Sequence, residues 1–274
     1  MVGRPKELLE MSKTEIAVLM PIYNPAEGLK ECLNSLRAQT VPFRLFIVDD
    51  GSKTKVDYKT YTQGLDCQII ELPKNLGITG AMNIGLSEIL KGKFKYIARV
   101  DYPDICEPTR FEKQIKFLAS HSDFCMVGTA TDYLYTQTGL TVAAKNPERY
   151  EDCVRALRYN APLTHGAIMF KADFWRELGQ YTDQYPAAED YAMECYAYSK
   201  GYKFGNLPEK LYTTIEIQQS ISVVSRAKQL KSRLLLQWRY ADWLSLHSYL
   251  GLIRTLLLMY GPIKLLRKIK SQIS

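Results

Sequence analysis

Short apolar runs alternate with segments of helical periodicity from Ile16 to Val100. The apolar runs are Ile16–Tyr23, Phe43–Val48, Cys67–Leu72 and Tyr96–Val100. Between them, apolar side chains recur at helical spacing over residues 29–36 and 79–90. Continuous apolar strands that alternate with helices indicate a parallel sheet covered on both faces. We therefore expect an α/β fold with a mostly parallel central sheet flanked by helices.

The spacing of elements is less regular after the fourth run. The expected elements there are a helix opened by Pro108, a strand at 124–129, an exposed hairpin at 131–145, a strand at 167–170, a helix at 172–178, a helix from 189 that ends at 201, and extended chain at 202–207. The hairpin alternates apolar and polar residues and turns around Gly139. No internal repeat interrupts this series.

Polar side chains follow directly after the expected strands. Tyr23 ends the first run, Asp49 and Asp50 end the second, and Asp101 and Asp104 follow the fourth. The carboxyl ends of parallel strands border the crevice where open α/β sheets bind ligands, so we expect a ligand site there. Two carboxylates three residues apart on a turn can hold a hard divalent cation against phosphate oxygens. The alternatives are that Asp104 orders a turn and that Asp49 and Asp50 cap the next segment.

The charge of the chain is concentrated near its C-terminus. Residues 226–274 contain ten Lys or Arg and one acid, Asp242, and so carry +9, whereas the whole chain carries +7. The rest of the chain is therefore close to −2, and we expect no nucleic-acid partner. A composition of 46% apolar and 24% charged residues is typical of a folded globular protein.

Three features predict a cytoplasmic protein. The six cysteines are scattered without a C-x-x-C pair and read as reduced core residues. Residues 1–13 lack the apolar segment of a secretory signal peptide. No run of about eighteen apolar residues occurs, so a membrane-spanning helix is not expected.

The composition changes near Ser222, where we place a domain boundary. We expect one domain over residues 1–222, with 1–13 as an N-terminal extension, and a helical tail over 223–274. The basic tail repeats Leu, Ile and Trp at helical spacing, which is typical of amphipathic helices lying on an anionic membrane surface. The same pattern fits helices that pack on the domain or form a dimer contact.

Six motifs occur in order along the expected domain. They are Met20-Pro-Ile-Tyr-Asn24, Val48-Asp-Asp-Gly-Ser52, Asn75-Leu-Gly77 leading to Asn83-Ile-Gly85, Arg99-Val-Asp101 through Arg110, His165-Gly166, and Glu189-Asp190. With these motifs in this order, the chain resembles the family 2 glycosyltransferases, inverting enzymes with the Rossmann-like GT-A fold. The resemblance extends from about Ile16 to Ser222.

The resemblance implies a binding site for a nucleotide diphosphate sugar, with a UDP-sugar as donor. In such a site, the ring of Tyr23 stacks on the uracil, and Asp50 accepts a hydrogen bond from the imide N–H of the uracil, with Asp49 nearby. Asn75 and Gly77 belong to the loop that borders the nucleotide.

Asp101 and Asp104 correspond to the region that binds the diphosphate and Mg²⁺ or Mn²⁺ in this family. Relatives often have Asp-x-Asp-Asp there, whereas this chain has Pro103 before Asp104, and proline offers no side-chain oxygen. Ile217 stands where many relatives have a histidine, and Met82 where many have an arginine. The cation is therefore held by these two carboxylates with waters and the diphosphate, or the enzyme depends less on metal than its relatives.

On the acceptor side, the resemblance makes Asp190 the catalytic base. An inverting transfer is one in-line displacement and needs a carboxylate to remove the proton of the attacking hydroxyl. Glu189 either orients the base or acceptor, or complements the helix dipole. His165 lies near the acceptor or the phosphates, or is a buried structural histidine.

The function implied is inverting transfer of a sugar from a UDP-sugar to a hydroxyl. The acceptor is then a lipid-linked surface polysaccharide or lipopolysaccharide, met at the inner face of the cell membrane. Two alternatives stay open. A nucleotidyltransferase would need a Gly-rich, basic phosphate loop after the first strand, which Asn24–Glu27 does not provide. A non-catalytic sugar-nucleotide-binding relative would explain the altered metal motif.

Overall fold

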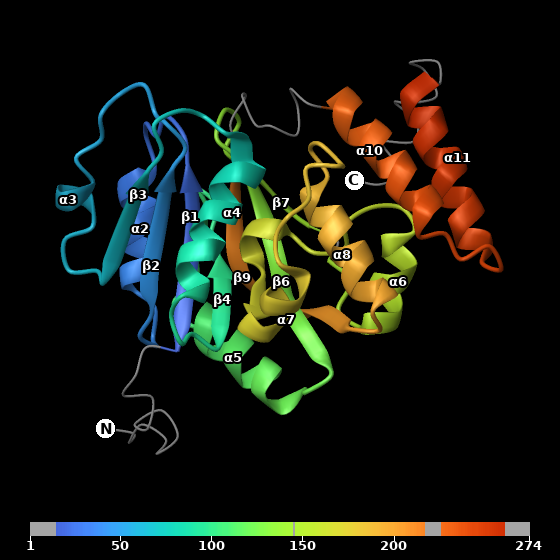
Figure 1. Ribbon diagram of the computed structural model, residues 1–274, viewed down its shortest axis with the longest axis horizontal. Helices are drawn as coiled ribbons and strands as arrows, with labels where there is room; N and C mark the ends of the chain where they lie inside the picture. The colour runs from blue at the N-terminus through green and yellow to red at the C-terminus, as the bar shows by residue number, and fades with distance from the viewer. Residues whose placement is uncertain (1–14, 145, 217–225, 261–274) are drawn as a thin grey trace.

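The computed structural model describes residues 15–144, 146–216 and 226–260, and a nine-stranded sheet runs through them (Figure 1). Along the sheet the order is β3 (Cys67–Glu71), β2 (Arg44–Asp49), β1 (Ile16–Ile22), β4 (Tyr96–Arg99), β8 (Met169–Lys171), β6 (Phe124–Tyr135), β9 (Lys203–Glu216) and β5 (Ile105–Cys106). A ninth strand, β7 (Leu140–Ala143), pairs with β6 outside this order.

The first four strands form the parallel half of the sheet that the apolar runs predict. β1 lies between β2 and β4 and pairs with both in parallel, and β2 pairs in the same way with β3. All seven residues of β1 are buried, because helices cover both of its faces. The carboxyl ends of β1, β2 and β4 therefore meet at one edge, which carries the polar residues that follow these strands.

The second half of the sheet is mixed. β8 is antiparallel to β4 and β6, whereas β6 and β9 pair in parallel. The expected hairpin forms, with Tyr135 opposite Leu140, but its first arm continues the strand from Phe124. β9 runs on to Glu216 rather than ending at Leu207. Pro208 is accommodated because it lies where the β6–β9 register shifts, a position that needs no ladder N–H.

Helices cover the two faces of the sheet, and each face has its own apolar core. One face carries α4 (Gly77–Leu90), α6 (Tyr150–Leu157), α7 (Ala172–Leu178) and α8 (Glu189–Ser199). The other carries α2 (Leu29–Arg37), α3 (Tyr58–Tyr61) and α5 (Arg110–Ser120). Five of the six cysteines are buried and none is in a disulfide, which fits their expected role in the core.

The tail forms two helices, α10 (Arg226–Arg239) and α11 (Leu246–Tyr260), at the end of the molecule away from β3 (Figure 1). They pack on the domain. Gln237 Nε2 donates to the Arg158 carbonyl (3.0 Å), and Ser232 Oγ donates to the Pro186 carbonyl (2.9 Å). Gly251 permits a close approach, since a Cβ there would lie 1.9 Å from the Arg158 carbonyl oxygen. Packing on the domain is thus one role of the tail.

The expected boundary near Ser222 lies outside the described residues. Among the residues that are described, no helix is long and apolar enough to cross a membrane.

Candidate active site

Hydrogen bonds join the loops that follow β1 and β2. The Asn24 N–H donates to Ser52 Oγ (2.8 Å), and the Lys53 N–H donates to Asn24 Oδ1 (2.8 Å). Asn24 has a positive φ of 46°, a conformation that asparagine adopts more readily than most residues. This turn leaves the neighbouring Tyr23 43% exposed at the carboxyl end of β1, where its ring is open to a ligand.

Asp49 and Asp50 are both buried but have different partners. Asp49 accepts hydrogen bonds from the Ser52 N–H at Oδ1 (2.9 Å) and from the Tyr58 hydroxyl at Oδ2 (2.7 Å). Asp50 accepts from the Leu76 N–H at Oδ1 (2.6 Å), and the neighbouring Gly77 N–H also favours its ionised form, but no hydrogen bond of good geometry to Oδ2 occurs within the described residues. Burial raises the pKa of Asp50 above its ordinary value. Asp49 therefore holds the loop together, whereas Asp50 keeps an oxygen for a ligand.

The loop from Asn75 to Gly77 closes over Gly51. A Cβ on Gly51 would lie 2.5 Å from the Lys74 carbonyl carbon, so only glycine permits this approach. Asn75 Oδ1 accepts from the Gly77 N–H (3.1 Å), and Gly77, with a positive φ of 78°, begins α4. The structure thus brings this loop next to Asp50, as expected for one nucleotide site.

The motif Asn83-Ile-Gly85 acts through packing. Asn83 Oδ1 accepts from the Tyr181 N–H (2.8 Å), and its Nδ2 donates to the Tyr181 carbonyl (3.0 Å). A Cβ on Gly85 would lie 2.3 Å from Leu19 Cδ1, so glycine lets α4 lie close against β1. Met82, the position where relatives have arginine, is buried in the core.

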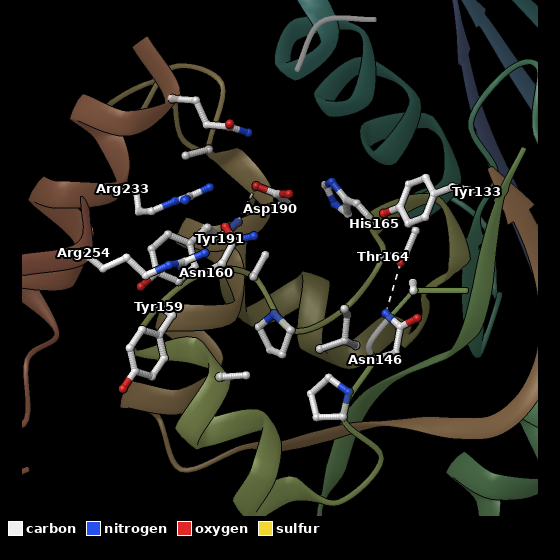
Figure 2. A pocket seen from close by; sticks show the side chains of 18 of the residues that line it. Tyr133, Asn146, Tyr159, Asn160, Thr164, His165, Asp190, Tyr191, Arg233 and Arg254 are labelled. Carbon is white, nitrogen blue, oxygen red and sulfur yellow. Dashed lines mark hydrogen bonds between the residues drawn. The ribbon is translucent and has the colours of Figure 1, made fainter. Parts of the chain in front are cut away.

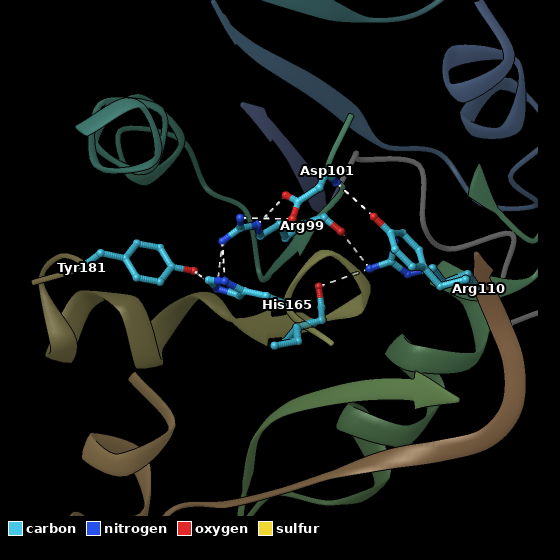
Figure 3. A network of polar contacts seen from close by, with 7 residues as sticks. Arg99, Asp101, Arg110, His165 and Tyr181 are labelled. Carbon is cyan, nitrogen blue, oxygen red and sulfur yellow. Dashed lines mark hydrogen bonds and ion pairs between the residues drawn. The ribbon is translucent and has the colours of Figure 1, made fainter. Parts of the chain in front are cut away.

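A polar network centred on Arg99 connects β4 to the 3₁₀ turn His165–Ala167 (Figure 3). Arg99 donates to both oxygens of Asp101, from Nε to Oδ1 (2.6 Å) and from Nη2 to Oδ2 (3.1 Å). Its Nη1 lies 2.7 Å from His165 Nδ1, and the Tyr181 hydroxyl lies 2.7 Å from His165 Nε2. Burial and the nearby guanidinium hold the pKa of His165 well below its ordinary value, so this histidine is neutral.

Buried groups behind the network fix its geometry. The fully buried Arg110 donates from Nη2 to the Arg99 carbonyl (2.8 Å), and the Asp101 N–H donates to the Tyr212 hydroxyl (3.0 Å). A Cβ on Gly166 would lie 2.4 Å from that hydroxyl, so the glycine of the His-Gly motif makes room for it. Arg110 and Gly166 therefore support the site without facing a ligand.

Asp104 is directed into the protein. It is 6% exposed, and its Oδ1 accepts from the Ile215 N–H of β9 (2.9 Å). Burial, and then the charge of Asp101, raise the pKa of Asp104 to about 7. Both features fit a structural carboxyl group better than a metal ligand.

The residues of the metal motif do not fit a cation site built from protein ligands. Asp101 binds Arg99 with both oxygens, Asp104 is buried against β9, and Pro103 has no donor atom. Within the described part of the chain, no group of three His, Cys, Asp or Glu side chains is arranged to hold a metal ion. The position of Ile217 lies outside that part. The expected pairing of Asp101 and Asp104 around one cation does not fit these contacts.

Glu189 and Asp190 occupy the first turn of α8. Asp190 accepts from the Tyr191 N–H at Oδ1 (2.6 Å), and its Oδ2 makes no hydrogen bond within the described residues. Glu189 Oε2 is buried without a partner there. Burial raises the pKa of Asp190, and burial with the neighbouring Asp190 raises the pKa of Glu189 to about 7. Each of these two carboxyl groups therefore keeps its proton to a higher pH than it would in water.

A pocket of about 1060 Å³ opens beside Asp190 and is lined by residues from four parts of the chain (Figure 2). Asp190 and His165 lie on one side of it, with Tyr133 and Thr164 farther along the wall. The opposite wall belongs to α10 and α11 and includes Gln229, Arg233, Leu250, Ile253, Arg254 and Leu257. The nucleotide-side residues Tyr23, Asp50 and Asn75 do not line this pocket.

Comparison with known proteins identifies the family of the chain. Residues 17–177 match the model of "Glycosyl transferase family 2". The chain belongs to this family. It is 31% identical over 201 residues to the amylovoran biosynthesis glycosyltransferase AmsE of Erwinia amylovora, covering 71% of this chain and 74% of that protein.

Two further proteins are similar to this family 2 glycosyltransferase. One is a UDP-Gal:alpha-D-GlcNAc-diphosphoundecaprenol beta-1,3-galactosyltransferase of Escherichia coli, 26% identical over 206 residues and 72% of each chain. The other is TarS residues 1–349 of S. aureus, solved with UDP-GlcNAc, with a TM-score of 0.69 at 18% identity over 89% of this chain and 72% of that chain. The TarS likeness confirms the GT-A fold.

The sequence motifs of the glycosyltransferase thus lead to two groups of side chains. Tyr23, Asp50 and Asn75 lie at the end of β1 and β2, and Asp101, His165 and Asp190 lie beyond β4 towards α8. The motifs give no indication of Arg233 or Arg254 in the pocket wall, because the tail lies outside the matched residues. The only sequence feature of the tail that points to these arginines is the presence of basic residues within an apolar repeat of helical spacing.

Proposed function

We propose that this glycosyltransferase transfers one sugar from a UDP-sugar to a hydroxyl with inversion at the anomeric carbon, using Asp190 as base. The observation that carries the proposal is the Oδ2 of Asp190, which makes no hydrogen bond within the described residues and lies in the wall of the pocket. The attacking oxygen forms its bond to the anomeric carbon as the bond to UDP breaks, and its proton passes to this carboxylate. A raised pKa makes Asp190 a stronger base than an ordinary aspartate.

On the donor side, the exposed ring of Tyr23 offers a stacking surface for uracil. The free oxygen of Asp50 accepts the imide N–H. The TarS complex with UDP-GlcNAc supports a nucleotide sugar in the same fold. Asp101 is the remaining carboxylate near the diphosphate, and we assign Mg²⁺ or Mn²⁺ a small contribution there, since Arg99 already binds both of its oxygens.

We assign the acceptor to the lipid-linked intermediates of surface polysaccharide or lipopolysaccharide assembly. The name of the Escherichia coli relative gives a diphosphoundecaprenol-linked sugar as its acceptor, and the Erwinia amylovora relative is named for amylovoran biosynthesis. Large apolar side chains on α10, on α11 and in the turn between them are exposed, among them Trp238, Leu244, Leu246 and Tyr260. These side chains support contact with the inner face of the membrane, where such acceptors are found.

The test is a donor screen followed by product analysis. UDP-sugars and GDP-mannose are offered with a lipid-diphosphate sugar, and the anomeric configuration of the product is read by NMR. The proposal predicts turnover of a UDP-sugar with inverted configuration. A retained configuration contradicts the single displacement, and binding of UDP-sugars without turnover in any acceptor mixture favours a non-catalytic relative.

A further inference from the structure

Two arginines from different helices enter the same pocket. Arg233 lies on α10 and Arg254 on α11, and both side chains extend into the pocket from the side opposite His165 (Figure 2). Arg233 is 9% exposed, so its guanidinium is largely removed from bulk water. Asp190 lies between this pair and His165 (Figure 2).

The charges of these arginines are not neutralised by the surrounding protein. Within residues 15–144, 146–216 and 226–260, neither guanidinium forms a salt bridge. Burial lowers the pKa of both groups, and the charge of Arg254 lowers that of Arg233 further. Asp190 is the carboxylate that favours the charged form of Arg233, but its Oδ2 is needed for the acceptor. A buried cation next to a half-buried one, without a matched carboxylate, is stabilised when an anion binds between them.

The rest of the pocket indicates what kind of anion fits. Asn160 offers a polar group on the wall below Asp190, whereas the Tyr159 hydroxyl is bound to His247 Nδ1 (2.8 Å) (Figure 2). Leu250, Ile253 and Leu257 of α11 continue the wall, and Ile253 is 52% exposed, so the apolar surface reaches the outside. A ligand that fills this path carries a sugar hydroxyl at Asp190, an anionic group at the arginines and an apolar chain along α11.

We propose that Arg233 and Arg254 form a subsite for the diphosphate that joins the acceptor sugar to its lipid. Arginine suits this group because its planar fork forms paired hydrogen bonds to phosphate oxygens. Arg233 is close enough to Asp190 to lower the pKa of that carboxyl group, which places the diphosphate near the reacting hydroxyl. The enzyme then extends the sugar next to the diphosphate. The reaction that supplies its acceptor must transfer a sugar phosphate to a lipid phosphate.

The subsite rests on the proposed role of Asp190, but it is tested by a different comparison. Arg233→Gln and Arg254→Gln are assayed with two acceptors that carry the same sugar, one with a lipid diphosphate and one as a neutral alkyl glycoside. Arg239→Gln is the matched control, since Arg239 lies on α10 outside the pocket and binds the Tyr185 hydroxyl. Assays are run at the pH optimum of each variant, and circular dichroism checks the fold.

Each pocket variant is expected to raise KM for the diphosphate acceptor about tenfold or more, with KM for the neutral acceptor and the donor unchanged. Arg233→Lys is expected to restore part of the affinity for the diphosphate acceptor, because lysine keeps the positive charge but lacks the planar guanidinium that forms paired hydrogen bonds. The subsite is overturned if KM changes equally for the two acceptors. It is also overturned if KM for the diphosphate acceptor is unchanged in both pocket variants.

A binding experiment decides the case in which no acceptor is turned over. Inorganic pyrophosphate is titrated calorimetrically into the protein saturated with UDP, so that the donor site is blocked. Binding to wild type and Arg239→Gln, with loss in Arg233→Gln and Arg254→Gln, supports the subsite even if the proposed reaction fails. Absence of binding to wild type overturns it. If the two pocket variants instead lose binding to phosphatidylglycerol vesicles and keep the wild-type affinity for pyrophosphate, the arginines bind lipid headgroups and the diphosphate subsite is overturned.

Discussion

The guanidinium of Arg99 binds both carboxylate oxygens of Asp101, at 2.6 Å from Nε to Oδ1 and 3.1 Å from Nη2 to Oδ2. This pairing offsets the charge of the carboxylate that we propose faces the diphosphate. A divalent cation at Asp101 would compete with a buried arginine for the same oxygens. Asp104 offers no second ligand, because its carboxyl group is bound to the backbone of β9.

We therefore predict a modest metal dependence. Chelation is expected to lower turnover by about tenfold or less, a smaller effect than loss of a cation that carries several kcal/mol of transition-state stabilisation. Asp101→Asn should remove the remaining stimulation by Mg²⁺ or Mn²⁺, whereas Asp104→Asn should keep it, since asparagine still accepts from Ile215. The ratio of activity with Mn²⁺ to activity with chelator is measured for all three proteins. Complete loss of turnover on chelation, together with loss of stimulation in Asp104→Asn, would restore the paired carboxylate site.

The adjacent acids Asp49 and Asp50 provide a matched pair for the nucleotide site. Asp50→Asn replaces the accepting oxygen by an NH₂ group, and the affinity for UDP is expected to fall about ten- to hundredfold. Asp49→Asn loses an acceptor for Ser52 or Tyr58, so it is expected to lower the free energy of unfolding by about 1–3 kcal/mol and leave UDP binding nearly unchanged. Calorimetry with UDP and thermal unfolding separate the two effects. Unchanged UDP affinity in Asp50→Asn removes this residue from the site.

Much of the donor side is predictable from the sequence because it depends on local order. Strands β1 to β4 are continuous apolar runs, and the polar residues after them must lie at one edge of a parallel sheet. Asp49 and Asp50 have different roles only because the Tyr58 hydroxyl binds Asp49, whereas the Leu76 N–H binds Asp50. A two-residue motif does not carry that information.

Other features depend on contacts between distant segments. Asp104 faces β9 because Ile215, 111 residues later, donates to it, and no local pattern predicts this pairing. Likewise, the pattern of residues within β9 does not predict that this strand pairs in parallel with β6. The helical repeat around Arg233 and Arg254 predicts two amphipathic helices. It does not predict that their basic side chains line a pocket in the domain, because amphipathic periodicity specifies a face and not its partner.

The pH dependence of turnover tests the shared environment of Glu189 and Asp190. The base must be ionised, and burial raises the pKa of Asp190, so kcat is expected to fall as the pH drops through this raised value. Glu189→Gln removes the carboxyl group whose titration is linked to that of Asp190, so the acid limb should move to lower pH. Glu194→Gln is the control on the same helix. Burial holds the pKa of Glu194 well above its ordinary value, so it is already neutral and its replacement should leave the limb in place.

An acid limb that does not move in Glu189→Gln would show that the two carboxyl groups titrate independently. A fall in kcat of Glu189→Gln as large as that expected for loss of the base would assign the base to Glu189 instead.

The exposed apolar surface of the tail predicts reversible binding to anionic vesicles. Trp238 and Leu244 are 65% and 99% exposed, and burying a large apolar side chain contributes about 1.5–3 kcal/mol. The double variant Trp238→Ser/Leu244→Ser is expected to lower the partition coefficient about tenfold or more, and salt should release part of the bound wild type. Leu140→Ser, an exposed leucine of β7, is the control and should sediment like wild type. Equal sedimentation of all three proteins would exclude these helices as the membrane contact.

The central claim is that Asp190 removes the proton from the acceptor hydroxyl. Asp190→Asn keeps the shape of the side chain and its hydrogen bond to the Tyr191 N–H but cannot accept the proton. The most direct measurement is the single-turnover rate of this variant with saturating donor and acceptor, alongside its affinity for UDP. The predicted result is a rate at least about a hundredfold below wild type with unchanged UDP affinity. A rate within a few-fold of wild type in a correctly folded Asp190→Asn protein would contradict the account.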